Sequence, residues 1–257
     1  MNSQFILNYT GQKFKETKEL NEIDFSKYKT IIEPFGGSFG FSRYLYEIKG
    51  LKDIEYIVYD NDEELIDFYN YIKQLLIDDN FDDFINEYNK IMEDIFNEFK
   101  TGKDSSQIKL KPSKLYLEGL NINQSLRYLI KKNIMSIIPR VNYKKKLKFL
   151  DMIKTTTFIY SKFNRDEIMK YDKENTLFYL DPPYLFEDNT SYNNIGDMKT
   201  FYEDIMYLFE NNKTIFIHSY NYLLNNVFGK YKQFQYTKRY GNSGKIVQHF
   251  VYGSYCK

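Results

Sequence analysis

The alternation of apolar and polar residues predicts strands and helices that follow one another near the start of the chain. A short β-branched run, TIIEP at 30–34, ends in an acid and a proline, and the glycine-bearing stretch FGGSFGFSRYLYEI predicts a turn and a helix start. A second apolar run, IEYIVYDND, precedes EELIDFYNYIKQLL, whose apolar residues recur with helical spacing. The order strand, helix, strand, helix favours a parallel sheet with crossover helices.

The pattern changes in the middle of the chain and changes back afterwards. From about residue 78 to residue 150 it is helical with almost no strand signal, which indicates an inserted helical subdomain. Strand signals return in TTTFIY (155–160), TLFYL (176–180) and KTIFIHSY (213–220). Two alternating runs then surround GNSG, which predicts a C-terminal β-hairpin. We therefore expect an α/β fold.

Length and composition agree with this interpretation. The chain has 257 residues, of which 42% are hydrophobic and 28% charged, as in a soluble globular protein with one domain and an insertion. The single cysteine, Cys256, favours a reducing compartment. No apolar stretch approaches the roughly 20 residues that span a bilayer, and the first residues do not resemble a signal peptide. We expect a protein that is not secreted and is cytoplasmic, or nuclear or in a viral factory if it comes from a eukaryotic virus.

The net charge of +1 hides an uneven distribution of charge. Residues 53–98 contain 15 acids against two lysines, whereas residues 127–148 contain eight bases and no acid. Residues 230–257 add six bases, again without an acid. Two basic blocks in a nearly neutral chain fit contact with phosphates, although solvated helix and hairpin faces would give the same pattern.

The glycine-bearing turn EPFGGSFG is typical of a ligand site. Glycines let a ligand approach the backbone, and the following helix start offers unpaired N–H groups. Asp60 ends the next predicted strand and is placed to bind ribose hydroxyls. The glycines at 36, 37 and 40 do not form the GxGxxG fingerprint of a dinucleotide site. A nucleoside cofactor without a pyrophosphate, S-adenosylmethionine above all, is therefore favoured.

The stretch TLFYLDPPY ends a predicted buried strand with an acid, two prolines and a tyrosine. Asp181 lies at the carboxyl end of that strand, where open α/β sheets bind their ligands. Pro182 and Pro183 form a rigid row of carbonyl acceptors without N–H groups. Tyr184 offers a flat face on which a base can stack. Together they indicate a pocket for an exocyclic amino group on a planar heterocycle.

These motifs, in this order, resemble those of the Dam-type DNA adenine-N6 methyltransferases. NYTGQK (8–13) is similar to the element that encloses the cofactor, EPFGGSFG to the FxGxG cofactor loop, and YDNDEELIDFYNYIK to the acid-bearing element after it. FYLDPPY matches the catalytic motif fully, and FIHSYNY (216–222) resembles the later strand that backs the active site. The chain departs from the family at Gln12, where a glycine is usual, and at Phe39, which replaces the last glycine of FxGxG.

The resemblance implies a Rossmann-like methyltransferase sheet with helices on both faces. Residues 1–74 and 151–257 would form the catalytic domain, and residues 75–150 a helical DNA target-recognition insertion. The implied catalytic residues are Asp181, Pro182, Pro183 and Tyr184. The implied cofactor-binding residues are Tyr9, Lys13, Glu33, Pro34, Phe35, Gly36, Gly37, Ser38, Phe39, Asp60, Asn61 and Asp181.

The resemblance also implies the reaction. A flipped adenine in duplex DNA would place N6 between Asp181 and the Pro182 carbonyl, in line with the methyl group of S-adenosylmethionine. The candidate DNA-binding residues are Lys144, Lys145, Lys146, Lys238, Arg239, Asn242 and Lys245. Double-stranded DNA is the expected partner, with no membrane and no metal. A cognate restriction endonuclease is possible, and we expect a monomer or weak dimer.

Three other functions remain open at this point. The same acceptor row would suit cytosine N4 or an RNA adenine, because any exocyclic amine presents the same hydrogens. A protein-glutamine methyltransferase is less favoured, since that family tends to carry Asn at position 181. A nucleic-acid binder on a degenerate methyltransferase fold would not bind the cofactor, and Phe39 is the residue that keeps this alternative open.

Overall fold

The computed structural model describes residues 7, 20–99, 113–133, 149–162, 164–171, 174–182, 197–219, 221–239 and 246–254. The chain divides into two compact units, which we describe separately. One comprises Met1–Gln12 and Glu63–Thr155, and the other comprises Lys13–Asp62 and Thr156–Lys257. Within the described parts, no helix is both long and apolar enough to cross a membrane.

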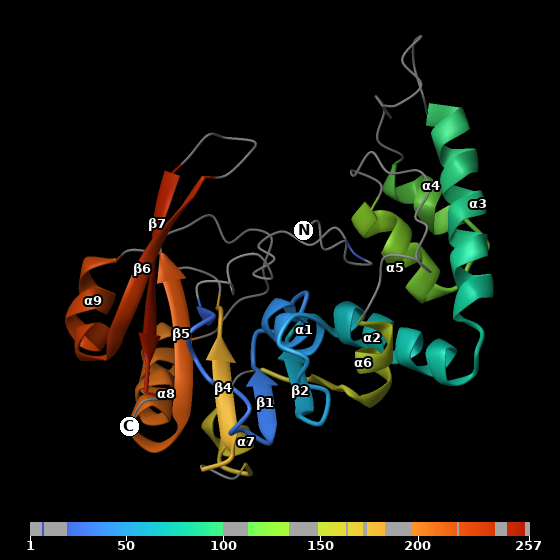
Figure 1. The fold of residues 1–257 in the computed structure, drawn as a ribbon. Coiled ribbons are helices and arrows are strands. Elements are labelled where there is room, and N and C mark those ends of the chain that lie inside the picture. Colours follow the sequence, from blue (N-terminus) through green and yellow to red (C-terminus); the bar gives the residue numbers. More distant parts are fainter. Residues whose placement is uncertain are drawn as a thin grey trace. The chain divides into compact units, whose positions relative to one another are not determined.

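The second unit contains a seven-stranded sheet with the order β3-β2-β1-β4-β5-β7-β6 (Figure 1). The strands are β1 (Thr30–Glu33), β2 (Glu55–Asp60), β3 (Thr157–Tyr160), β4 (Thr176–Leu180), β5 (Lys213–Ser219), β6 (Lys232–Arg239) and β7 (Ile246–Gly253). The first five strands are parallel, and β7 joins β5 and β6 in antiparallel pairs. The predicted α/β class is confirmed.

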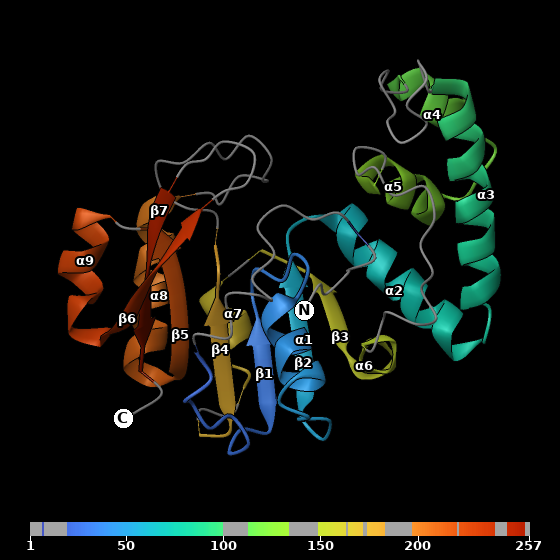
Figure 2. The ribbon, with the colours of Figure 1, turned by 45° about the horizontal axis from the view of Figure 1, so that its top comes forward.

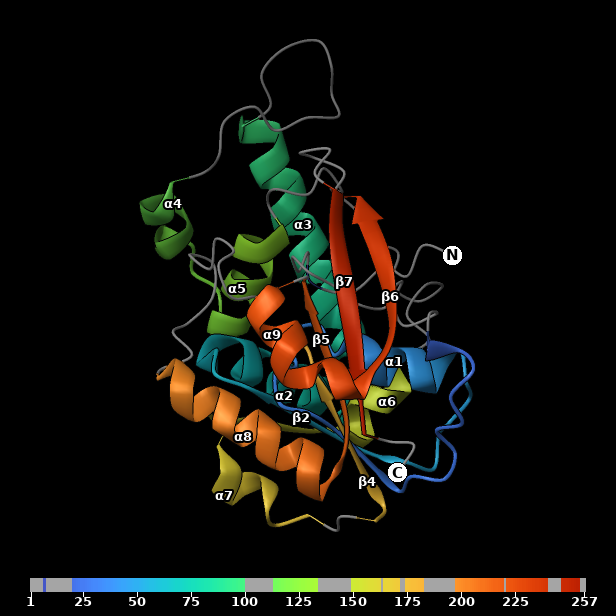
Figure 3. The same cartoon turned by 90° about the vertical axis from the view of Figure 1, so that its left-hand side faces the viewer.

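The last two strands form the hairpin that the sequence predicts around GNSG (Figure 3). The pairing runs from Lys232 opposite Tyr252 to Arg239 opposite Ile246, with an irregularity between Lys232 and Phe234. Side chains along β6 alternate between exposed and half-buried positions, as expected for an edge strand. The hairpin therefore extends the parallel sheet at one edge.

Side chains of alternate strand residues point to opposite faces of the sheet, and helices cover both (Figure 2). One face packs against α7 (Arg165–Ile168), α8 (Met198–Asn211), α9 (Tyr222–Phe228) and the short 3₁₀ turn Gly229–Tyr231. Its core is rich in aromatic rings: Phe228 lies 5.3 Å from both Phe209 and Phe216, measured between ring centroids. Aromatic residues make up 19% of the chain, and many of them pack in this core.

The opposite face packs against α1 (Gly40–Glu47). The ring of Phe41 stacks on Tyr179 of β4 with a centroid distance of 4.1 Å and an interplanar angle of 7°. Phe25 meets the edge of the Phe41 ring at 5.3 Å. Phe41 is fully buried, so it anchors the first turn of α1 to the centre of the sheet.

The other unit is helical over its described residues. It contains α2 (Glu63–Ile77), α3 (Phe81–Phe99), α4 (Lys114–Gly119), α5 (Gln124–Asn133) and α6 (Leu150–Thr155). Helix α2 packs against α3, α5 and α6, with Phe68 5.5 Å from Tyr128 between ring centroids. Residues 75–150 lie within this unit, and their role in target recognition stays a prediction.

One strand boundary differs from the predicted one. The run TTTFIY predicts a strand from residue 155, but Thr155 ends α6 and β3 begins at Thr157. The hydroxyl of Thr155 donates a hydrogen bond to the carbonyl of Met152 at 3.1 Å, three residues earlier. This bond to the preceding turn satisfies the threonine side chain inside a helix, against its strand preference.

We expect Phe41→Ala to lower the free energy of unfolding by about 3–5 kcal/mol, because it empties a packed site between α1 and β4. Tyr222→Ala is the matched control, since Tyr222 is exposed on α9, and it should change stability by less than about 0.5 kcal/mol. Urea denaturation of both variants measures the difference. Equal stabilities would contradict the anchoring role of Phe41.

Candidate active site

Three carboxylates gather at the carboxyl ends of neighbouring parallel strands. Glu33 ends β1, Asp60 ends β2, and Asp181 directly follows β4. Strand β1 pairs with both neighbours, and Glu33 lies opposite Val58 of β2. Because side chains alternate, Asp60 falls on the same face as Glu33, and the register of β4 places Asp181 there too. This is the face that α1 covers.

The turn between β1 and α1 packs tightly against β2. A Cβ atom on Gly36 would lie 2.1 Å from Cγ1 of Val58 and 3.1 Å from the carbonyl oxygen of Tyr59. The N–H of Gly36 donates to that same Tyr59 oxygen at 2.7 Å. Gly37 has a φ of +47°, a conformation that glycine adopts without strain. Glycine is therefore required at 36 by space and favoured at 37 by conformation.

Phe39, the departure from the family pattern, takes a left-handed conformation with a φ of 38°. Its ring is fully buried and meets Phe158 of β3 edge-on at 5.5 Å between centroids. The residue before α1 therefore has its side chain in the core. The backbone N–H of Phe39 donates a hydrogen bond to the Gly36 carbonyl at 2.5 Å, which closes the turn.

Asp60 fixes the turn from the end of β2. Its Oδ2 accepts the N–H of Gly37 at 2.8 Å, and its Oδ1 accepts the N–H of Asp62 at 3.0 Å. Burial raises the pKa of this carboxyl, and the two hydrogen bonds oppose that effect. Each carboxylate oxygen can accept more than one hydrogen bond, so Asp60 can hold the turn and still accept from a ligand hydroxyl.

Glu33 lies beneath the first turn of α1. Its side chain is almost completely buried, and Oε1 accepts the N–H of Ser42 at 2.7 Å. Burial raises the pKa of Glu33 to about 7, hydrogen bonds from Ser42 and Phe41 act in the opposite direction, and the negative charge of Asp181 raises it further. Glu33 therefore caps a helix and interacts with the predicted catalytic acid.

The structure brings the other described residues of the predicted site to the same edge. Asp181 and Asn61 are half-buried, Pro34, Ser38 and Pro182 are buried, and Phe35 packs edge-on against Phe201 of α8 at 5.7 Å. Several predicted residues lie outside the described part of the chain: Tyr9, Lys13, Lys144, Lys145, Lys146, Pro183, Tyr184, Asn242 and Lys245. Lys238 and Arg239 end β6, and Arg239 is exposed.

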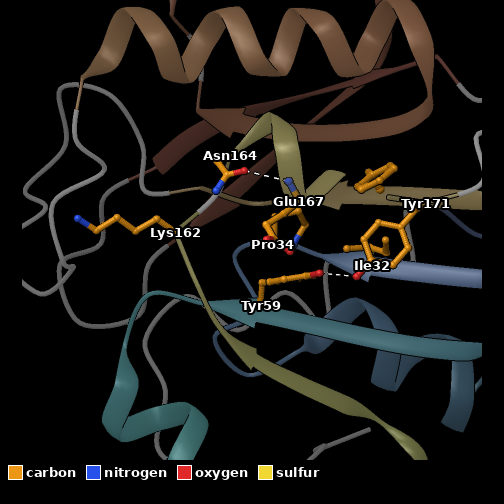
Figure 4. A pocket seen from close by; sticks show the side chains of 8 residues that line it. Ile32, Pro34, Tyr59, Lys162, Asn164, Glu167 and Tyr171 are labelled. Atoms are coloured by element: carbon orange, nitrogen blue, oxygen red, sulfur yellow. Dashed lines mark hydrogen bonds between the residues drawn. The ribbon is translucent and has the colours of Figure 1, made fainter. Parts of the chain in front are cut away.

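A small pocket that opens to solvent lies on the other face of the sheet, beside Pro34 (Figure 4). It is lined by Ile32, Pro34, Tyr59, Lys162, Asn164, Glu167, Tyr171 and Phe178. The hydroxyls of Tyr59 and Tyr171 are hydrogen-bonded, and Asn164 caps α7 by accepting the N–H of Glu167 at 2.9 Å. The sequence analysis missed this pocket.

A sequence signal for the pocket existed. Lys162 and Asn164 follow β3, whose carboxyl end lies beside that of β2 in a parallel sheet. Open α/β sheets bind their ligands at the carboxyl ends of their strands, which is why Asp60 and Asp181 were predicted to lie there. The same rule would have predicted that Lys162 and Asn164 lie at this edge.

The chemistry of this edge suits S-adenosylmethionine. Its sulfonium and ammonium groups are cationic and its ribose carries hydroxyl donors, and the edge offers carboxylate acceptors at Glu33, Asp60 and Asp181. The pocket beside Pro34 is small and lies on the opposite face of the sheet from these carboxylates, with Ile32, Pro34 and Phe178 among its apolar walls. Among the described residues, no group of three or more His, Cys, Asp or Glu could hold a metal ion.

Comparison with known proteins agrees with this assignment. The family model for D12 class N6 adenine-specific DNA methyltransferases matches residues 9–237. No curated protein matches the chain significantly. Among solved structures, the N-terminal domain of human METTL16 in complex with SAH is similar at 7% sequence identity and a TM-score of 0.40, over 94% of this chain and 67% of that one. This likeness is distant, and the family match carries the assignment.

We expect Gly36→Ala to weaken binding of S-adenosylmethionine at least tenfold and to destabilise the fold, because the new Cβ collides with Val58. Val58→Ala in the same chain removes the colliding Cγ1 and should restore part of the loss. Gly50→Ala is the control for a glycine with open space around it, although its φ of +71° costs some stability. Equilibrium titration of the wild type and the three variants decides, and unchanged binding in Gly36→Ala would show that the turn does not form the site.

Proposed function

The chain belongs to the D12 class N6 adenine-specific DNA methyltransferase family, and we propose that it methylates N6 of one adenine within a defined sequence of duplex DNA. As a member of that family it is an S-adenosylmethionine-dependent DNA adenine methyltransferase. The single observation that supports the proposed site is the position of Asp181. It follows β4 directly, beside the glycine turn and on the face of the sheet that also carries Glu33 and Asp60.

In this proposal the turn at 34–39 and Asp60 hold the cofactor. Asp60 would accept hydrogen bonds from the ribose hydroxyls while its bond to Gly37 keeps the turn in place. When bound, the cofactor supplies an electrophilic methyl group on a positively charged sulfur.

Asp181 and the carbonyl of Pro182 hold the target amine. Its nitrogen is a weak nucleophile because the lone pair is delocalised into the ring. Two acceptors that bind its two hydrogens draw the nitrogen toward a tetrahedral geometry and free the lone pair for attack. Tyr184 would stack on the flipped base, and a few kcal/mol of unstacking must be recovered by these contacts. The residues therefore act by positioning and electrostatics.

The DNA backbone would contact the basic residues of the hairpin and of the block around Lys144–Lys146. Lys238 and Arg239 lie at the end of β6 that adjoins the hairpin turn. Lysine and arginine at such places neutralise phosphates and fix the register of the duplex, without reading the sequence.

We predict that Asp181→Ala lowers the rate of methyl transfer by a factor of about 10²–10³, the usual effect of removing one preorganised electrostatic partner. Asp181→Asn keeps one acceptor and should fall between Asp181→Ala and the wild type. The exposed Asp53→Ala is the control. Rates come from single-turnover reactions with DNA, followed by mass spectrometry of the nucleosides, and cofactor binding is titrated separately. Full activity of Asp181→Ala would refute this mechanism.

The same mass spectra separate the alternatives. N6-methyladenine in DNA supports the proposal. N4-methylcytosine, or methylation of RNA alone, would support the related enzymes that use the same acceptors. A wild-type protein that neither binds S-adenosylmethionine nor modifies nucleic acid would be a binder on a methyltransferase fold.

We predict that charge reversal at Lys238 and Arg239 reduces the salt dependence of DNA binding. Each lost phosphate contact should lower the slope of log Kd against log salt by about 0.9. Reversal at Lys144, Lys145 and Lys146 should do the same. The control reverses the exposed Lys27 and Lys52, which precede the amino ends of β1 and β2, at the opposite edge of the sheet. Slopes equal to that of the wild type would exclude these residues from the DNA interface.

A further inference from the structure

Glu33 is a buried acid whose visible role is to cap the first turn of α1. Burying a carboxylate for that purpose alone is energetically unfavourable. Its side chain is 2% exposed, and its Oε1 accepts the Ser42 N–H at 2.7 Å. A serine, threonine or neutral amide can satisfy a helix N-terminus without burying a charge. The position of the acid, at the end of the strand that lies between β2 and β4, suggests a second role.

The charged and polar groups around Glu33 come from three elements. Asp181 follows β4, which pairs with β1, and it lies on the same face of the sheet as Glu33, so two like charges are close together. Tyr56 of β2 lies on that face in the other neighbouring strand. Ser42 and the Phe41 backbone contact it from α1. The cation of α1, Arg43, is buried and paired with Glu47 at 3.3 Å. The placement of the two carboxylates on one face, at the carboxyl ends of paired strands, therefore links Glu33 to the predicted amine site.

We propose that Glu33 is a positioning residue for methyl transfer, whose ionised carboxylate acts through Asp181 to strengthen its hold on the hydrogens of the target amine. The inference rests on the proposed function. A negative neighbour raises the proton affinity of a carboxylate, so Asp181 beside an ionised Glu33 is a better acceptor than Asp181 beside a protonated one. For each methyl group gained, N6 gives up one proton, which Asp181 accepts and passes to water.

This role makes the rate depend on pH near neutrality. Burial raises the pKa of Glu33 to about 7, so the carboxyl is mostly protonated at pH 6 and mostly ionised at pH 8. The ionised fraction rises about tenfold over that range, and the rate of methyl transfer should rise with it. Because Glu33 and Asp181 interact, the observed midpoint belongs to the pair.

The test compares pH profiles of single-turnover methyl transfer for the wild type, Glu33→Gln and Glu33→Asp, with saturating S-adenosylmethionine and plasmid DNA free of N6-methyladenine. Glutamine can still accept the Ser42 N–H but carries no charge. We expect the wild-type rate to rise about tenfold from pH 6 to pH 8. Glu33→Gln should give a flat profile, at or below the rate of the wild type at pH 6. The exposed Glu22→Gln is the control and should keep the wild-type profile.

The outcomes are distinct. The inference is overturned if the rate of Glu33→Gln still rises from pH 6 to pH 8. It is also overturned if that variant has a flat profile at the rate that the wild type reaches at pH 8. If Glu33→Gln does not fold, Glu33→Asp provides the test. The aspartate side chain is intrinsically more acidic, so the midpoint of the pH profile should move to lower pH. An unchanged midpoint overturns the inference. A wild-type protein that forms no N6-methyladenine at any pH refutes the proposed function instead.

Discussion

The close packing of the β1–α1 turn against β2 is the constraint on which the rest of the site depends. Gly36 has no room for a Cβ beside Val58, and its N–H is bonded to the Tyr59 carbonyl at 2.7 Å. This contact brings the Gly37 N–H onto Asp60 and leads the chain into α1 directly above Glu33. A larger residue at 36 would separate the turn from the strand and release both carboxylates from their partners.

The sheet gathers negative charge at one edge because parallel strands end together. Glu33, Asp60 and Asp181 would repel one another and lose hydration without compensation. Backbone N–H groups supply part of this compensation. Asp60 accepts hydrogen bonds from Gly37 and Asp62, and Glu33 accepts one from Ser42. A cationic cofactor and the hydrogens of an amine would supply the rest. The same concentration of charge that costs stability in the folded protein thus favours the ligands of the proposed reaction.

Local signals in the sequence predicted much of this architecture. The β-branched runs, the glycine turn and the alternating residues around GNSG have few competing structures, and the strands at 30–33, 176–180 and 213–219 follow them. The family was recognised from the same short motifs, and the match over residues 9–237 confirms it. The assignment of single residues to cofactor and DNA stays a prediction, since their partners are not part of the chain.

Other features depend on contacts between distant residues and could not be seen in the sequence. The bond from Gly37 to Asp60, the burial of Glu33 and the packing of Phe39 on Phe158 each require the folded sheet. The pocket that includes Tyr59, Tyr171 and Lys162 combines residues from four segments, so its walls require the folded sheet, although the place of Lys162 and Asn164 at the ligand edge could have been predicted. Thr155 shows the reverse case, in which a residue that favours strands ends a helix because its hydroxyl has a partner there.

The central claim is that Asp181 at this edge directs methylation to adenine N6 in DNA. The most direct measurement is sequencing of DNA from cells that express either the wild type or Asp181→Ala, with a method that reports modified bases. The account predicts N6-methyladenine at one short recurring sequence with the wild type and none with the variant. Unmodified adenine in both samples, or modification on cytosine, would contradict it.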